Sequence, residues 1–322
     1  MALPRRLVLD GLLLVMVLIW AGNYSLVKVV LRDVPPLGFN AARLTVASAV
    51  FLVTLTAAFW LGPSQAGGVA GVMTRPGRLS RRDWLVLALL GFVGHFVYQL
   101  LFIGGLARTT VANSALIIGC SPVAIALVTA IVGHERIGRL HWAGAALSVS
   151  GLYLVAGRGA AVARASAAGD AMMLGAVCCW AVYTVYSRPL LARHSPLVVT
   201  ATSMIFGTVF LLATTGWQLV GMDWRRVSAL DWAAVVASAV FALNLAYLIW
   251  YTAVQRIGNA RTSMYSNLVP VTAMAIAWVG VGEPVELVKL GGAGLILSGV
   301  ALTRFSKSGP ITRERLDAPA ES

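Results

Sequence analysis

The chain has 322 residues, of which 59% are hydrophobic and 11% are charged, and its mean hydropathy is +0.83. A typical soluble domain carries roughly 25% charged residues, so the composition excludes a water-soluble globular protein. Burying this much apolar surface in water would need a larger core than a chain of this length can enclose. The composition therefore predicts a protein embedded in a lipid bilayer.

The formal net charge of the chain is +13. The Lys and Arg residues are scattered in ones and twos between apolar runs, with few aromatic residues among them. This pattern does not favour a nucleic-acid partner and is typical of the loops of a membrane protein. The three cysteines, Cys120, Cys178 and Cys179, show neither disulfide nor metal-ligand spacing. We therefore expect no metal and no cofactor.

Ten apolar windows, separated by charged or Gly/Pro-containing breaks, predict an all-α integral membrane protein with ten transmembrane helices. The first window follows two arginines, as a signal peptide does, but it is too long for one and lacks a small-residue cleavage site. We expect it to remain as a span. In chain order the windows are 7–30, 39–61, 84–106, 111–132, 141–157, 171–191, 197–220, 232–254, 262–281 and 287–303.

The fifth and tenth windows are short but rich in small residues, which favours close helix packing. These residues are Gly144, Ser148, Gly151, Gly291, Gly294, Ser298 and Gly299. The gap 62–83 is a long loop. The tail 306–322 is expected to be disordered and cytoplasmic.

The distribution of positive charge predicts the orientation. If the termini and the even-numbered loops share a face, that face holds sixteen of the 25 Lys and Arg residues and the other face holds nine. Positive charge concentrates on the cytoplasmic side, so both termini are expected to be cytoplasmic. Arg outnumbers Lys by 22 to 3, which is compatible with a GC-rich genome, and the expected location is the bacterial cytoplasmic membrane.

The chain contains an internal repeat. A shift of 148 residues relates three consecutive windows of the two halves without a gap, and a shift of 160 residues relates the windows before them. The longer loop at 62–83 absorbs the difference. Matched pairs include Trp20 and Trp180, Pro36 and Pro196, Asp83 and Asp231, Arg108 and Arg256, Pro122 and Pro270, Glu135 and Glu283, Gly144 and Gly292, and Gly151 and Gly299.

Each repeat therefore contains five predicted helices, with the first at 1–165 and the second at 166–305. Because five is odd, the second repeat must enter the membrane from the opposite side, and the two repeats are inverted. Inverted repeats that rock around a midplane site are typical of secondary transporters.

An ordered pattern of residues recurs in the two halves. It consists of Trp20, Pro36, Arg43, Ala112, Leu116, Pro122, Glu135, Gly144 and Gly151, followed by Pro270, Gly282, Glu283, Gly292 and Gly299. This pattern resembles the EamA family of the drug/metabolite transporter superfamily over nearly the whole chain. The resemblance implies a ten-helix 5+5 carrier, commonly an exporter of small metabolites, amino acids or drugs. The chain departs from the pattern at Ser203, the second-half counterpart of Arg43, and at His134, where the second half has a glycine.

Enzymatic motifs are absent. The chain lacks a phosphate-binding loop, a zinc-protease helix motif and a nucleophile elbow, so ATP hydrolysis is not expected to drive it. The acidic residues lie at predicted helix ends or in loops, which leaves no midspan carboxylate for a proton relay. We expect a protein that is not an enzyme.

His95 is an ionisable residue in the middle of the third predicted helix. Intramembrane ionisable groups usually face the bundle interior. Two interpretations stay open: contact with the substrate or a proton, or a neutral imidazole hydrogen-bonded between helices. Its second-half counterpart is Leu243, so no role shared by both repeats requires it.

Polar and aromatic side chains at helical spacing predict a substrate cavity between the halves. The third and eighth helices are repeat mates, so their polar stripes are expected to face each other, with aromatic walls from the first and sixth helices. The alternative is that these side chains connect helices or lie in interfacial belts. The expected binding residues are Trp20, Tyr24, His95, Tyr98, Gln99, Trp180, Tyr183, Asn244, Tyr247, Ser266 and Asn267. Trp250 and Tyr251 are left out because they lie near a helix end.

Two basic residues, Lys28 and Arg43, are expected near the outer ends of their helices. Each can attract a carboxylate at the external mouth or extend into the lipid headgroups, and the headgroup interpretation is favoured for Lys28. For Arg43 both interpretations stay open.

Two matched prolines, Pro122 and Pro270, are expected to remove a backbone hydrogen bond midway along their helices. They are hinges for rocking or static kinks. Glu135 and Glu283 are expected to close the fourth and ninth helices, in ion pairs with nearby basic residues or as gates.

These observations predict a secondary transporter that moves a small organic metabolite, amino acid or drug across the cytoplasmic membrane by alternating access, in the outward direction. The lipid bilayer and a small-molecule substrate are the expected partners, and the oligomeric state is left open. The alternatives are a membrane enzyme acting on lipids, for which no catalytic cluster is found, and a receptor or scaffold that transports nothing.

Overall fold

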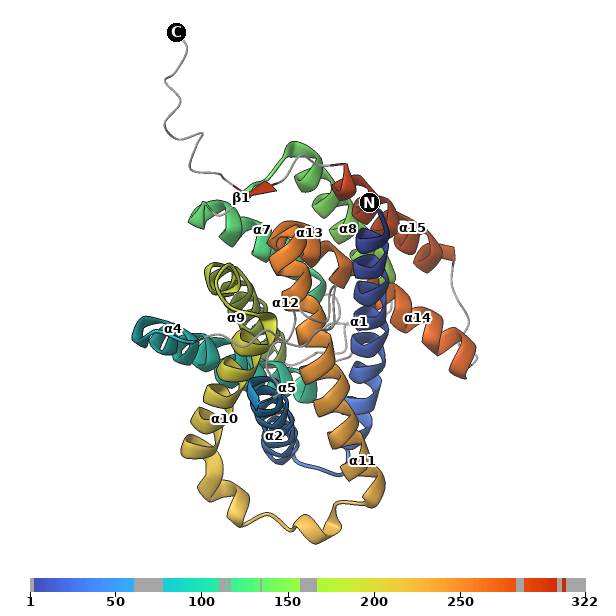
Figure 1. Cartoon of the computed structure of the whole chain (residues 1–322). Helices are drawn as coiled ribbons and strands as arrows, with labels where there is room; N and C mark the ends of the chain where they lie inside the picture. Colours follow the sequence, from blue (N-terminus) through green and yellow to red (C-terminus); the bar gives the residue numbers. More distant parts are fainter. Residues whose placement is uncertain are drawn as a thin grey trace.

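The structure of the protein is a computed structural model that describes residues 3–60, 78–109, 114, 117–133, 135–156, 167–281, 287–305 and 309–310. Helices make up nearly all of this described part (Figure 1). A two-residue antiparallel pairing joins β1 (Glu135–Arg136) to β2 (Gly309–Pro310). This pairing includes the described residues of the predicted tail.

The helices follow the predicted apolar windows. In the first half they are α1 (Leu3–Val30), α2 (Pro36–Trp60), α4 (Arg81–Gly91), the π-helical η1 (Phe92–Val97), α5 (Tyr98–Arg108), α7 (Ser121–Val132) and α8 (Arg139–Ala156). In the second half they are α9 (Ala167–Leu191), α10 (Pro196–Val220), the 3₁₀ turn η2 (Trp224–Arg226), α11 (Ala229–Ala237), the π-helical η3 (Ser238–Leu245), α12 (Ala246–Ile257), α13 (Asn259–Met264), the 3₁₀ turn η4 (Tyr265–Asn267), α14 (Leu268–Val281) and α15 (Leu287–Arg304).

Six helical stretches within the described residues are long and apolar enough to cross a bilayer. They are Leu7–Val30, Pro36–Ala58, Arg81–Arg108, Ala167–Leu191, Pro196–Val220 and Ala229–Ile257. Two shorter apolar helices, Ile117–Val132 and Leu290–Leu302, accompany them. The chain is therefore a multi-pass helical membrane protein.

The two halves fold alike at residues that the 148-residue shift relates. Ser80 and Asp83 form a capping box at the start of α4, and Ser228 and Asp231 form the same box at the start of α11. Each helix then passes into a π-helical segment, η1 in the first half and η3 in the second. π-Helical insertions are rare and frequently occur at functional sites.

The contacts between helices also repeat with the two halves exchanged. Helix α9 contacts α5 and α7, and its repeat mate α1 contacts their mates α12 and α14. Helix α10 contacts α4 and η1, and its mate α2 contacts α11 and η3. The mates α2 and α10 contact each other, as do α8 and α15, which lie side by side at one end of the molecule (Figure 1). The internal repeat of the sequence is thus a repeat of structure.

Small residues join α8 to α15, as the sequence predicts. A Cβ atom at Gly151 would collide with the backbone of Gly292, and one at Gly299 would collide with Ser148 and the backbone of Gly144. Gly291 and Gly294 have open space beside them instead, so they do not contribute to this contact.

Pro122 and Pro270 each lie at the start of an α-helical segment and not midway along it, although α13, η4 and α14 together run without a break over 259–281. Pro122 is in the first turn of α7, after a turn at Cys120, and Pro270 is in the first turn of α14, after η4. Proline is tolerated in a first turn because the N–H it lacks would have no intrahelical partner there. The α-helical pattern therefore changes just before each proline, to a turn at Cys120 in the first half and to the 3₁₀ turn η4 in the second.

Asp83 joins the two halves as well as capping α4. One carboxylate oxygen accepts a hydrogen bond from Nη2 of Arg193 at 2.7 Å, and the other lies 3.1 Å from Nε2 of His194. Asp83 is buried although Arg193 is exposed. These contacts join the start of α4, the first helix of the third predicted span, to the connection between α9 and α10.

Replacing Asp83 by Asn should lower the free energy of unfolding more than replacing Asp231 by Asn. Both variants lose the charged N3 member of a capping box, a device worth about 0.3–1.5 kcal/mol. The Asp83 variant also loses charge-assisted hydrogen bonds to Arg193 and His194, worth roughly 1–3 kcal/mol more. Thermal unfolding in one detergent compares the two variants, and equal losses would contradict the role of the second-half contacts.

Candidate functional site

A cavity of about 1030 Å³, including its opening, lies between the two halves. Both repeats supply its walls, from α1, α2, α5 and α7 in the first half and from α9, η3, α12, η4 and α14 in the second. The lining residues are Trp20, Asn23, Tyr24, Ser25, Arg43, Tyr98, Gln99, Phe102, Ile118, Gly119, Ser121, Trp180, Ala242, Leu243, Tyr247, Ser266, Val269 and Pro270.

Most of the residues singled out from the sequence line this cavity. They are Trp20, Tyr24, Arg43, Tyr98, Gln99, Trp180, Tyr247, Ser266 and Pro270. The other five, His95, Pro122, Tyr183, Asn244 and Asn267, are not among the lining residues.

Aromatic rings form the centre of the cavity wall. Trp20 and Trp180, which the repeat relates, meet edge to face with ring centroids 5.9 Å apart, and Tyr247 lies 5.4 Å from Trp180. The Trp20 indole N–H donates to the carbonyl of Ala242 in η3, at 3.2 Å, which fixes the ring against the other half. Such rings supply apolar contact area with a specific geometry.

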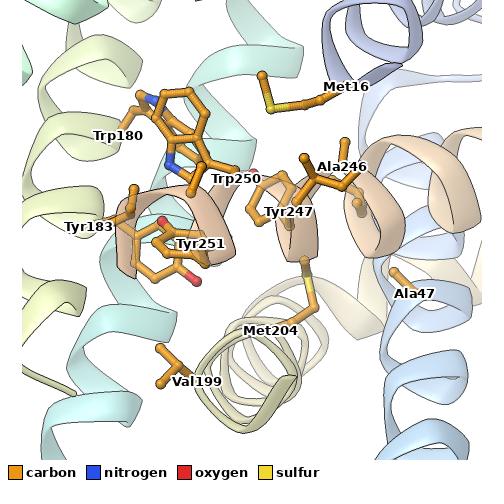
Figure 2. Packing of buried hydrophobic residues seen from close by; sticks show 14 of the residues in the cluster. Met16, Ala47, Trp180, Tyr183, Val199, Met204, Ala246, Tyr247, Trp250 and Tyr251 are labelled. Atoms are coloured by element: carbon orange, nitrogen blue, oxygen red, sulfur yellow. The ribbon is translucent and has the colours of Figure 1, made fainter. Parts of the chain in front are cut away.

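Trp250 and Tyr251, which were not predicted as binding residues, belong to the same aromatic cluster. The Trp250 ring is 5.4 Å from Trp20 and 5.3 Å from Trp180, and Tyr251 is 5.2 Å from Tyr183. Figure 2 shows the rings of Trp180, Tyr183, Trp250 and Tyr251 gathered between α9 and α12. The side chains of Trp250 and Tyr251 are fully buried and do not line the cavity, so they support the wall from behind.

Arg43 lies two turns inside α2, buried in the cavity wall. Its Nη2 donates to Oε1 of Gln99 at 2.5 Å, and its Nη1 donates to the hydroxyl of Ser238 at 3.3 Å. Ser238 in turn donates to Oδ1 of Asn23 at 2.7 Å. The guanidinium also lies over the ring of Phe39, 5.1 Å from its centroid. The expected position near the outer end of the helix is wrong, because α2 begins at Pro36.

His95 is buried behind the cavity in a hydrogen-bonded group. Its Nε2 lies 2.8 Å from the hydroxyl of Tyr183 and 3.3 Å from that of Ser203, and those two hydroxyls are 2.8 Å apart. A Cβ atom at Gly94 would collide with the Tyr183 ring, and one at Gly207 with Cβ of His95. Glycines therefore let η1, α9 and α10 approach closely enough to enclose the imidazole.

The two asparagines of the predicted set lie outside the lining as well. Asn244 donates to the carbonyl of Ala47 at 2.9 Å and so joins η3 to α2. Asn267 in η4 is buried, and its amide makes no hydrogen bond to the described residues.

Lys28 does not line the cavity and instead bonds to the end of a neighbouring helix. Its ammonium donates to the carbonyls of Leu106 at 2.9 Å and Thr109 at 3.4 Å. These carbonyls close α5, where a cation is favourable because the helix dipole is negative there. Glu283 and His134 lie outside the described residues, as do Ala112 and Leu116, and the side chain of Glu135 is not described either.

Sequence reasoning missed half of the lining. The missed residues are Asn23, Ser25, Phe102, Ile118, Gly119, Ser121, Ala242, Leu243 and Val269. Asn23 and Ser25 flank Tyr24 within an apolar span, and that polar interruption was the available signal. The small and aliphatic residues carry none, because they resemble any helix contact.

Comparison with known proteins agrees with this architecture of two similar halves. Residues 8–157 and 167–305 each match the EamA-like transporter family. The chain belongs to the EamA-like transporter family. The family resemblance inferred from the sequence is confirmed, and the two matches coincide with the two structural repeats.

Relatives in this family are named as transporters. A "Probable terminal-alkyne amino-acid exporter" of Streptantibioticus cattleyicolor is 31% identical over 90% of this chain and 91% of its own length. An "Uncharacterized transporter YyaM" of Bacillus subtilis is 27% identical over 86% of this chain and 87% of its own. A crystal structure with 22% identity shares the fold, with a TM-score of 0.71 over 96% of this chain and 99% of that one. This EamA-like protein is therefore a membrane transporter of the drug/metabolite type.

Proposed function

We propose that this EamA-like protein is a secondary transporter that exports a small organic solute across the bacterial cytoplasmic membrane by alternating access. The observation that carries the proposal is the cavity between the repeats, which both halves line and in which the matched residues Trp20 and Trp180 meet. A small relative motion of the halves would change the access to such a site, as in other carriers built from repeats. The relative named as an amino-acid exporter supports the outward direction.

In this proposal, aromatic and polar side chains of the cavity lining bind the solute. Rings at Trp20, Tyr98, Trp180 and Tyr247 supply apolar area, and Gln99 and Ser266 supply polar contacts. His95, Tyr183, Asn244 and Asn267 position this wall from behind. The segments just before Pro122 and Pro270 act as hinges, because the backbone departs from the α-helical pattern there, at a turn at Cys120 and at the 3₁₀ turn η4.

Flux measurement tests the proposal. The purified protein in liposomes should move at least one member of a panel of amino acids, small metabolites and drugs, chosen first by its effect on the protein's thermal unfolding. Protein-free liposomes and liposomes with a heat-inactivated sample give the background. Solutes that stabilise the protein but are never moved would instead indicate a receptor, and chemical conversion of a lipid would indicate an enzyme.

The proposal includes ten spans in an inverted 5+5 arrangement with both termini cytoplasmic. The exchanged helix contacts and the charge distribution support it. Single cysteines at Ala165 and Ala70, two positions outside the described residues, should then be labelled from opposite faces in a cysteine-free background. An impermeant maleimide applied to whole cells and to inverted vesicles measures this. Labelling of both positions from one side would contradict the arrangement.

A further inference from the structure

Arg43 is the one charged side chain among the described residues that line the cavity. It is only 1% exposed, and a guanidinium stays protonated under all ordinary conditions. Its hydrogen-bond partners, Gln99 and Ser238, are neutral, and its Nε has no partner. The cavity wall therefore carries a positive charge that no carboxylate of the described residues neutralises.

An unpaired charge in a membrane interior is unfavourable, because neither lipid nor buried protein replaces the hydration it has lost. The neutral partners and the Phe39 ring offset this cost only in part. An anion that enters the cavity would offset more of it, since attraction between charges is stronger where water is excluded. A guanidinium also presents parallel N–H donors that match the two oxygens of a carboxylate.

The second half shows that the fold does not need a cation at this position. The repeat mate of Arg43 in α2 is Ser203 in α10, whose hydroxyl is within hydrogen-bond distance of Tyr183 and His95. Ser203 is buried and does not line the cavity. One repeat thus fills the site with neutral groups, and the other directs a cation into the cavity.

Building on the transport role proposed above, we infer that the solute is an organic carboxylate with an apolar or aromatic body. Its carboxylate binds Arg43 beside Gln99, and its body packs against Trp20, Trp180 and Tyr247. An organic cation fits less well, although aromatic walls can hold one, because Arg43 repels it. A phosphate monoester carries close to two negative charges, one more than this wall neutralises.

Matched probes test the charge preference directly. The protein in lipid nanodiscs is titrated with 3-phenylpropionate and indole-3-propionate, and with the amide and the primary amine of the same two bodies. At least one carboxylate should bind at least ten-fold more tightly than its amide and its amine. Because all three forms share a body, the difference reports on the charged group alone.

Three variants assign the preference to Arg43. Arg43→Gln should weaken carboxylate binding about ten-fold and leave amide binding within two-fold. Gln99→Glu should weaken carboxylate binding to a similar degree while raising the unfolding temperature, since it gives Arg43 a carboxylate within the wall. Lys28→Gln removes a positive charge from outside the lining and should leave both carboxylate and amide binding within two-fold, so it is the binding control for the overall charge of the first half.

The Gln99→Glu variant keeps the test decisive if Arg43→Gln fails to fold, because it is expected to be more stable. Tighter binding of the amides or amines, no binding of either carboxylate at millimolar concentration, or equal carboxylate affinity in wild type and Gln99→Glu would each overturn the inference. Failure of the proposed function differs from these results: the carboxylate would bind as described, yet no solute would move in liposomes.

Discussion

Replacing Trp180 by Ala should reduce transport per folded molecule about thirty-fold. The Trp180 ring lines the cavity between Trp20 and Tyr247, and loss of a central aromatic contact at a binding site typically costs about 2 kcal/mol or more. Initial flux in liposomes, divided by the amount of monodisperse protein recovered, measures the effect.

Trp250→Ala is the matched control for this variant. Trp250 has the same side chain, lies 5.3 Å from Trp180 and is fully buried, but it does not line the cavity. Both variants should lose stability, because removing a buried Trp side chain costs roughly 3–5 kcal/mol. Transport per folded molecule should fall less than three-fold in Trp250→Ala. If the two variants lose transport equally, Trp180 acts through packing, and the cavity wall is not the binding surface.

The repeat predicted much of the fold and the centre of the site. Trp20 and Trp180 were matched by position in the two halves, and matched residues on inward faces must meet near the axis that relates the halves. Tyr98, Gln99 and Tyr247 followed from helical spacing, because polar and aromatic residues at that spacing form one stripe of a helix. The matched tryptophans and the polar stripes were predictable because the repeat and the helical spacing can both be read from the sequence.

Other features depend on contacts that no local pattern records. The π-helical segments η1 and η3 consist of residues that are equally compatible with an α-helix. The contact of Asp83 with Arg193 and His194 joins residues more than a hundred positions apart. The depth of Arg43 was misjudged because α2 begins at Pro36, one turn before the apolar window. The first two features are decided by packing between helices, and the third by where a helix begins.

The repeat also relates the hydrogen-bonded group around Arg43 to the hydrogen-bonded group around His95. Asn23 and Arg43 in the first half correspond by the 160-residue shift to Tyr183 and Ser203 in the second. Asn23 belongs to the hydrogen-bonded chain that includes Ser238 and Arg43, and Tyr183 belongs to the group with Ser203 and His95. Equivalent places in the fold therefore hold a charged group that faces the cavity and a neutral group that lies behind it.

His95→Leu should lower the free energy of unfolding by about 1–3 kcal/mol, because the hydroxyls of Tyr183 and Ser203 lose their shared buried partner. Leucine fits the backbone of this position, since Leu243 occupies the matched position of η3. His95→Gln keeps a hydrogen-bonding group and should lose less stability. Thermal unfolding of the two variants in detergent measures this order.

The same variants decide whether His95 carries protons. The imidazole is fully buried and does not line the cavity, and its ring centroid lies 5.5 Å from that of Tyr247, which does line it. We therefore expect flux in liposomes to respond to an imposed pH gradient to the same degree in His95→Gln and wild type, whatever the size of that response. If wild-type flux depends on the gradient and the Gln variant retains exchange without that dependence, His95 is the proton-coupling residue, and the cavity must open as far as the imidazole during transport.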